Sequence, residues 1–108
     1  MTNVSNAQTV AFDRAIKAGA SLGKAETAFA GRVADLREAG FTAEDLKGEG
    51  RFFAWAQRRT AELTLNKAQF ATWADESLAQ GVTKDGKRVD TERGKLVKRV
   101  NASLARLR

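Results

Sequence analysis

The sequence contains no histidine, cysteine, tyrosine or proline. Without cysteine the chain has no disulfide, no thiolate nucleophile and no zinc site of the usual finger type. Without histidine it lacks the commonest general base near neutral pH and the triads built on it. Carboxylates remain, but most lie three or four residues from a Lys or Arg in segments that read as helix, as Asp13 and Lys17 do. We therefore expect a protein that is not an enzyme and needs no metal or cofactor.

Long apolar stretches are also missing. No uncharged run approaches the roughly 20 residues that cross a bilayer, and residues 1–6 show no basic cluster followed by an apolar segment. The sequence therefore predicts a cytoplasmic protein without a signal peptide or membrane contact. Its 108 residues and 43% hydrophobic content suit one folded domain, residues 1–108.

Twenty alanines and scattered β-branched residues favour helices joined by short glycine-containing turns. We predict an all-α fold, a bundle of about five helices. The longer ones are expected over residues 5–18, 24–39, 51–63, 67–80 and 93–107, with a short helical segment after Thr42. Apolar residues at three- and four-residue steps mark the second helix: Leu22, Ala25, Phe29, Val33 and Leu36.

Capping residues delimit several of these helices. Gly40 is expected to end the second helix, and Thr42 stands between Phe41 and Leu46 in the positions of an N-cap and its hydrophobic staple. Asn66 can cap the helix that we expect to end before Gly81. The helices over 51–63 and 67–80 are predicted to form the aromatic centre of the core, with these inward residues: Phe52, Phe53, Ala56, Leu63, Phe70, Trp73, Ala74 and Leu78.

Residues 82–89 contain the pair Asp85-Gly86 between short flanks, a local signal for a tight β-hairpin. An irregular loop is the alternative. After it, Asp90 or Thr91 can cap the last helix, and Glu92 suits its first turn.

Positive charge is concentrated at the C-terminal end. Residues 1–81 hold ten basic and ten acidic side chains, whereas residues 82–108 hold nine basic side chains against three acids, so this quarter carries the whole net charge of +6. At about 100° per residue, the last helix separates an aliphatic face from a basic face. With the preceding turn, that face gives the candidate contacts for nucleic-acid phosphates: Lys84, Lys87, Arg88, Lys95, Lys98, Arg99 and Arg106.

Cations in register bind phosphates in a salt-dependent way with little dependence on base sequence. We therefore predict a nucleic-acid-binding protein, with DNA and RNA both open, whose contacts extend from the last helix to the hairpin if the hairpin folds back. A merely solvated basic face is the structural alternative.

A second candidate cluster for a partner interface or for base stacking comprises Arg51, Trp55, Arg58 and Arg59. The alternative is that Trp55 closes the edge of the core while the arginine stems cover it. A different function class also suits the sequence, namely a small adaptor or inhibitor that binds a larger acidic protein. Close packing of alanine-rich helices is compatible with a homo-oligomer in either role.

Overall fold

The computed structural model describes residues 3–20 and 26–108. Its elements, in order along the chain, are α1 (Asn6–Ala20), α2 (Glu26–Glu38), the 3-10 turn η1 (Glu44–Leu46), α3 (Phe53–Thr64), α4 (Lys67–Ala74), β1 (Gly81–Lys84), β2 (Lys87–Asp90) and α5 (Glu92–Ala105). The predicted small helical domain with a hairpin before its last helix is confirmed. The stripe residues Leu22 and Ala25 lie outside the described residues.

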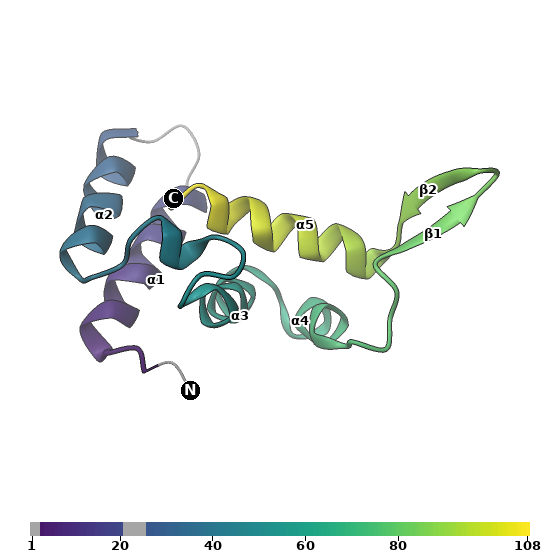
Figure 1. Ribbon diagram of the computed structural model, residues 1–108, viewed down its shortest axis with the longest axis horizontal. Coiled ribbons are helices and arrows are strands. Elements are labelled where there is room, and N and C mark those ends of the chain that lie inside the picture. Colours follow the sequence, from purple (N-terminus) through teal and green to yellow (C-terminus); the bar gives the residue numbers. More distant parts are fainter. Residues whose placement is uncertain (1–2, 21–25) are drawn as a thin grey trace.

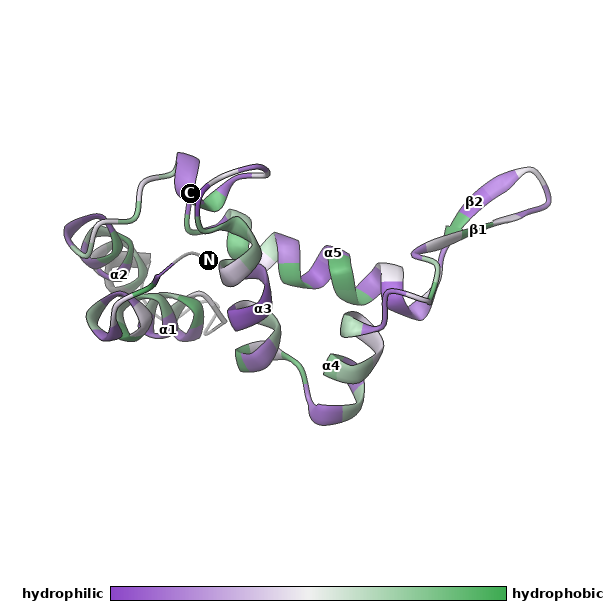
Figure 2. Ribbon diagram, turned by 60° about the horizontal axis from the view of Figure 1, so that its bottom comes forward, coloured by the Kyte–Doolittle hydropathy of each residue, from purple (hydrophilic) through white to green (hydrophobic). Residues whose placement is uncertain are grey.

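Helix α5 is the central helix, along which the other helices pack (Figure 1). Its C-terminal end reaches α1 and α2, which run side by side, α3 crosses it near the middle, and α4 packs near its N-terminal end. Figure 2 shows hydrophobic and hydrophilic positions alternating along α5, as an amphipathic helix requires. On the aliphatic face predicted for this helix, four residues are buried and Val97 is half-buried. The buried residues are Leu96, Val100, Leu104 and Leu107.

Two apolar clusters hold these helices together. The larger one joins α1, the end of α2, η1, the start of α3 and the end of α5 through ten buried residues, namely Phe12, Ala15, Ile16, Leu36, Phe41, Leu46, Phe52, Ala56, Leu104 and Leu107. The smaller one lies between the end of α3, α4 and the first half of α5. It consists of Ala61, Leu65, Leu96 and Val100, with Phe70 and Trp73 packed against them.

The expected aromatic centre is therefore wrong in its location. Phe12 of α1 and Phe41 after α2 meet Trp55, with ring centroids 4.9 Å and 5.8 Å from the indole, and Phe52 packs on Phe41 at 5.1 Å. The predicted pair of helices contributes only half of this cluster, because α1 and the segment after α2 supply the other rings. Phe53 and Leu63, predicted to be buried, are half-buried.

Local hydrogen bonds explain several boundaries. Asn66 Oδ1 accepts from the Gln69 amide while the Asn66 amide donates to Gln69 Oε1, which confirms the predicted N-cap. Thr42 and Asp45 form the same reciprocal pair at the start of η1, but the N-cap residue of this turn is Ala43 and not the predicted Thr42. Thr91 Oγ1 accepts from the Gly94 amide and caps α5. Gly40, with φ of 103°, follows the last turn of α2.

Helix α4 ends at Ala74, six residues before the predicted end at Gln80. Asp75 Oδ1 accepts hydrogen bonds from the amide and the hydroxyl of Ser77, and this side-chain turn replaces the next helical turn. The same two bonds lower the pKa of the Asp75 carboxyl. Leu78 is consequently exposed, and Gly81 begins β1 instead of ending a helix.

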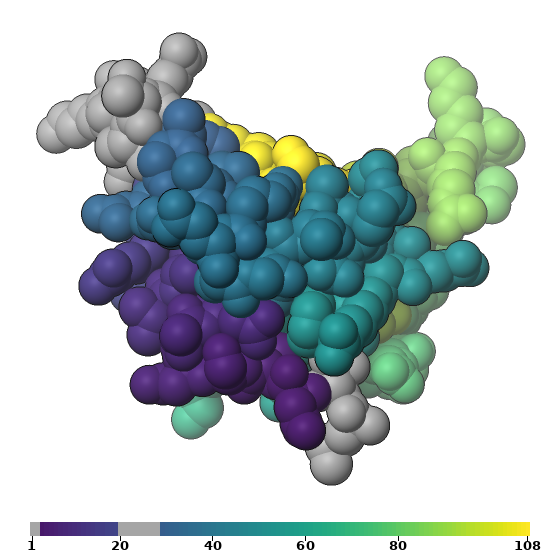
Figure 3. Space-filling model, turned by 60° about the vertical axis from the view of Figure 1, so that its left-hand side comes forward, coloured from purple at the N-terminus to yellow at the C-terminus, as the bar shows by residue number. Residues whose placement is uncertain are grey.

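The hairpin is regular and stands apart from the helices. Val82 pairs with Val89 and Lys84 with Lys87, and φ is positive at both Asp85 and Gly86, as a tight hairpin turn of two residues requires. In Figures 1 and 3 the strands project beyond the helical body. Most residues of the two strands are exposed.

Candidate nucleic-acid interface

The tip of the hairpin presents a pair of lysines. Lys84 and Lys87 are opposite each other in the register next to the turn, so their side chains leave the same face of the sheet. Arg88, opposite Thr83, leaves the other face, because neighbouring residues of a strand alternate. Its guanidinium side chain extends over Gly81, where a Cβ atom would lie 2.7 Å from Arg88 Nε. The hairpin is therefore basic on both faces.

The first two turns of α5 add three cations beside the hairpin. Lys95 is exposed, and in the described part of the chain no hydrogen bond or ion pair engages its ammonium group. Lys98 Nζ lies 2.6 Å from Asp90 Oδ2 at the base of β2, yet 72% of the Lys98 side chain is exposed. Arg99 Nη2 donates to the Thr64 carbonyl over 3.2 Å. Only Lys98 is paired with a carboxylate, so these residues keep most of their positive charge.

Arg106 does not belong to this group. It lies at the opposite end of α5, where its guanidinium donates to the Gly19 carbonyl and stands 5.1 Å from the Phe29 ring centroid. The molecule is 48 Å long, and the hairpin extends away from α5 instead of folding back along it. The structure thus brings six of the seven predicted cations to one end and leaves Arg106 in a contact that ties α5 to α1 and α2.

The second predicted cluster is engaged in the fold. Trp55 is half-buried in the aromatic cluster described above. Arg59 binds Asp13 through two hydrogen bonds of 2.8 Å and 2.6 Å and also pairs with Glu62, and the bonds to Asp13 are the main cause that raises the pKa of Arg59. Arg51 lies over the Phe52 ring. The half-buried position of Trp55 is the one expected if it closes the edge of the core, whereas Arg51 covers the ring of Phe52 and Arg59 pairs with acids.

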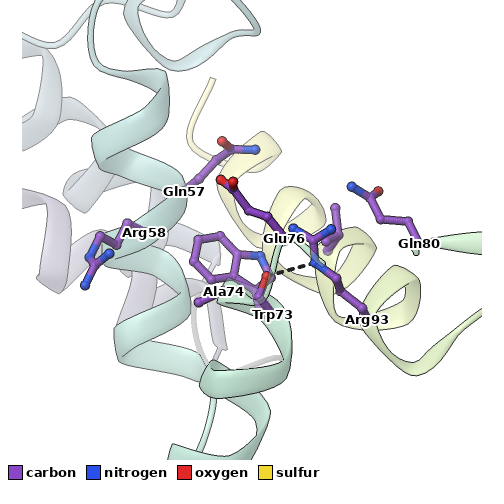
Figure 4. Close-up of a pocket in the computed structure, with 8 residues that line it drawn as sticks. Gln57, Arg58, Trp73, Ala74, Glu76, Gln80 and Arg93 are labelled. Atoms are coloured by element: carbon purple, nitrogen blue, oxygen red, sulfur yellow. Dashed lines mark hydrogen bonds between the residues drawn. The ribbon is translucent and has the colours of Figure 1, made fainter. Parts of the chain in front are cut away.

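Arg58 is the member of that cluster that also lines a hollow, although its guanidinium points away from Trp73. It pairs with Glu62 and lies 5.5 Å from the Phe70 ring centroid, with 67% of its side chain exposed. The hollow, between α3, α4 and the start of α5, has a volume of about 330 Å³ and is shown in Figure 4. The residues that line it are Gln57, Arg58, Trp73, Ala74, Glu76, Gln80, Arg93 and Val97.

A second hollow of about 280 Å³ adjoins the hairpin base and shares Gln80 with the first. Its other lining residues are Arg88, Asp90, Gly94 and Lys98. Arg93 stabilises the segment between the two hollows, because its Nε donates to the Trp73 carbonyl and its Nη1 donates to the Leu78 carbonyl. Cations predicted as phosphate contacts therefore lie next to an aromatic hollow.

Of the residues that line the larger hollow, the sequence interpretation named only Arg58 as a candidate contact. It assigned Trp73 to the core and expected a helix over residues 67–80, which in fact ends at Ala74. The Asp75-x-Ser77 pattern, a side-chain turn signal, was the feature that could have indicated the earlier end.

Within the described ranges, no three side chains of the acidic, histidine or cysteine types cluster as a metal site. None of the described helices has the length and apolar character needed to cross a membrane. No known protein family matches the chain, and neither a curated protein nor a solved structure resembles it.

Proposed function

We propose that this protein binds nucleic acid in the cytoplasm, mainly through phosphate contacts from the hairpin and the first two turns of α5. The projecting basic hairpin is the observation that carries the proposal. Two antiparallel strands with exposed cations on both faces, beside a helix that adds three more, can approach a backbone without displacing any helix. The role is one of binding and not of catalysis.

The physical basis is the release of counterions. Each cation that neutralises a phosphate frees condensed counterions, so the logarithm of the binding constant falls linearly with the logarithm of salt concentration, with a slope of about 0.9 per phosphate for duplex DNA. Asp85, Asp90 and Glu92 oppose this attraction, but Asp90 is already paired with Lys98 and six cations outnumber the three acids. The contacts carry little information about base sequence.

The test is a titration of duplex DNA, single-stranded DNA and RNA by fluorescence anisotropy at several salt concentrations. The variant in which Lys84, Lys87 and Lys95 are all changed to Gln is expected to bind every sequence more weakly, with a salt slope smaller by about three. A matched variant changes Arg14, Arg32 and Lys47, exposed cations on α1, α2 and after η1, to Gln and removes the same charge. It should retain most of the affinity and the slope. Equal losses in the two variants would contradict the proposed interface.

A second candidate function is binding to an acidic protein, and the exposed valine pair favours it. Val82 and Val89 are 50% and 43% exposed and face the same side of the hairpin as Lys84 and Lys87, as an apolar anchor beside steering charges would. Such a complex would survive nuclease treatment and be lost when both valines are changed to Thr. Captured material that consists only of nucleic acid would exclude this function.

A further inference from the structure

The hollow around Trp73 has the composition of a binding site for one flat, polar ring. We propose that it holds a single unpaired nucleobase stacked on Trp73, in a strand whose adjoining phosphate lies on Arg88 and Lys98 in the second hollow. This inference rests on the proposed nucleic-acid binding and specifies the form of nucleic acid, namely a single strand.

Size and shape favour one base. The volume of about 330 Å³ lies at the lower end of the range for small-molecule sites, which begins at about 300 Å³. In Figure 4, Trp73 stands at the centre of the hollow, Gln57 and Glu76 lie above it, and Gln80 and Arg93 lie to its right. A duplex keeps its bases stacked inside, so only an unpaired or extruded base reaches such a site.

The indole is held in place for stacking. Trp73 packs against Phe70 with a centroid distance of 5.6 Å, and the Arg93 guanidinium fixes the Trp73 carbonyl. Trp73 is only half-buried. Ala74 and Val97 provide apolar surface in the same hollow. Stacking of a base on an aromatic side chain contributes about 1–3 kcal/mol.

The polar groups around the indole have unused hydrogen-bonding capacity. Gln57 uses Nε2 to donate to Asn101, which leaves Oε1 as an acceptor. The Gln80 amide and the Glu76 carboxylate have no partner among the described residues. An ionised carboxylate accepts hydrogen bonds only, so Glu76 favours a base with adjacent donors on its edge. Guanine, with N1–H and N2–H₂, is the base that fits.

The second hollow supplies the phosphate contact. Gln80 lines both hollows, so a base on Trp73 places its backbone toward Arg88 and Lys98. Arg88 extends over Gly81 and can offer its guanidinium to a phosphate, and Lys98 is mostly exposed despite its bond to Asp90.

The experiment compares an oligothymidylate of about ten nucleotides carrying one central guanine with the all-thymidine strand and with a duplex of the same length. In wild-type protein we expect the guanine strand to bind most tightly and to quench tryptophan emission. Trp73→Leu should weaken single-strand binding about tenfold, remove the quenching, and leave duplex binding unchanged. Guanosine monophosphate alone should compete only weakly, because it lacks the neighbouring phosphates.

Two further variants, at Glu76 and Gln80, keep the test independent of folding, because both side chains are exposed. Glu76→Gln should abolish the preference for guanine over thymine, and Gln80→Ala should weaken single-strand binding, both without a change in melting temperature. The inference is overturned if single strands and duplex bind alike without quenching, or if Trp73→Leu weakens both forms equally. Binding that depends on Lys84, Lys87 and Lys95 but not on Trp73 would overturn this inference and leave the proposed function intact. Absence of binding to any nucleic acid at low salt would overturn both.

Discussion

Arginine side chains hold much of this fold by donating to backbone carbonyls. Arg37 reaches the carbonyls of Phe41 and Leu107, and Arg108 reaches that of Leu46. These bonds connect α2, η1 and the end of α5, which are far apart in the sequence. A carbonyl does not neutralise the guanidinium, so such arginines stabilise the structure while the surface stays positive. Basic residues in the sequence therefore cannot all be assigned to ligand binding.

The Asp13–Arg59 pair is predicted to stabilise the contact of α1 with α3. The two side chains are 20% and 31% exposed and form two charge-assisted hydrogen bonds. We expect Asp13→Asn to lower the free energy of unfolding by about 1–3 kcal/mol, measured by urea denaturation. The control Asp35→Asn breaks the more exposed pair with Arg32 and should cost less than about 0.5 kcal/mol. Equal losses would show that burial of the first pair is irrelevant.

Thr60 provides a prediction of increased stability. Its Oγ1 atom is buried without a hydrogen-bond partner among the described residues. Thr60→Val keeps the shape and removes the unsatisfied hydroxyl, so the free energy of unfolding should rise by about 1 kcal/mol. Thr64→Val is the control, since Thr64 Oγ1 already donates to the Thr60 carbonyl over 2.7 Å, and it should give no gain. A loss of stability in the Thr60 variant would refute the assignment.

At the scale of elements, the join between the hairpin and α5 depends on one close approach. Thr91 donates from its amide to the Gln80 carbonyl and from its hydroxyl to the Ala79 carbonyl. These bonds hold the segment before β1 against the first turn of α5. Gly94 is buried at the crossing, and a Cβ atom there would lie 1.9 Å from the Gln80 carbonyl oxygen. Only glycine fits this position.

Replacing Gly94 with Ala should therefore destabilise the protein, although alanine is the better helix former. We expect a loss of about 1–3 kcal/mol in thermal or urea unfolding, because the segment at Gln80 must move. Gly31 in α2 is the matched control, since nothing lies within 4 Å of an added Cβ. Gly31→Ala should stabilise the protein by about 0.5–1 kcal/mol. Stabilisation by both substitutions would contradict the close approach.

At the scale of the whole molecule, the helical body and the hairpin are separable. Both core clusters consist of residues from the helices and their connections, and no residue of β1 or β2 belongs to either. We therefore expect that removal of the hairpin changes the stability of the helical body little.

We predict that residues 83–88 can be replaced by Asn-Gly. Val82 and Val89 face each other as the same type of antiparallel pair as Lys84 and Lys87, so a two-residue turn can join them. The shortened protein should keep its melting temperature within a few degrees, at about the level of surface changes. It should lose nucleic-acid affinity to a similar extent as the variant lacking Lys84, Lys87 and Lys95, because each change removes three cations. A large fall in melting temperature would show that the hairpin supports the core.

Much of the fold followed from local patterns. The caps at Asn66 and Thr91, the turn at Asp85-Gly86 and the buried face of α5 were each predictable, because side chains close in sequence decide them. The two errors have different causes. Helix α4 ends early because Ser77 bonds to Asp75, which is a local signal. The place of the aromatic centre depends on distant partners, since Phe12 of α1 meets Trp55 of α3.

The sequence by itself determined the helical class, the hairpin and the excess of cations in the last quarter, since composition, spacing and turn chemistry act within a few residues. Only the tertiary structure decided which cations share a surface. The outward direction of the hairpin separates Lys84 and Lys87 from Arg106, and the early end of α4 leaves Trp73, Glu76 and Gln80 around one hollow. Asp75 and Ser77 end α4 locally, but the grouping of these side chains depends on how α3, α4 and α5 pack on one another, and no local pattern encodes that packing.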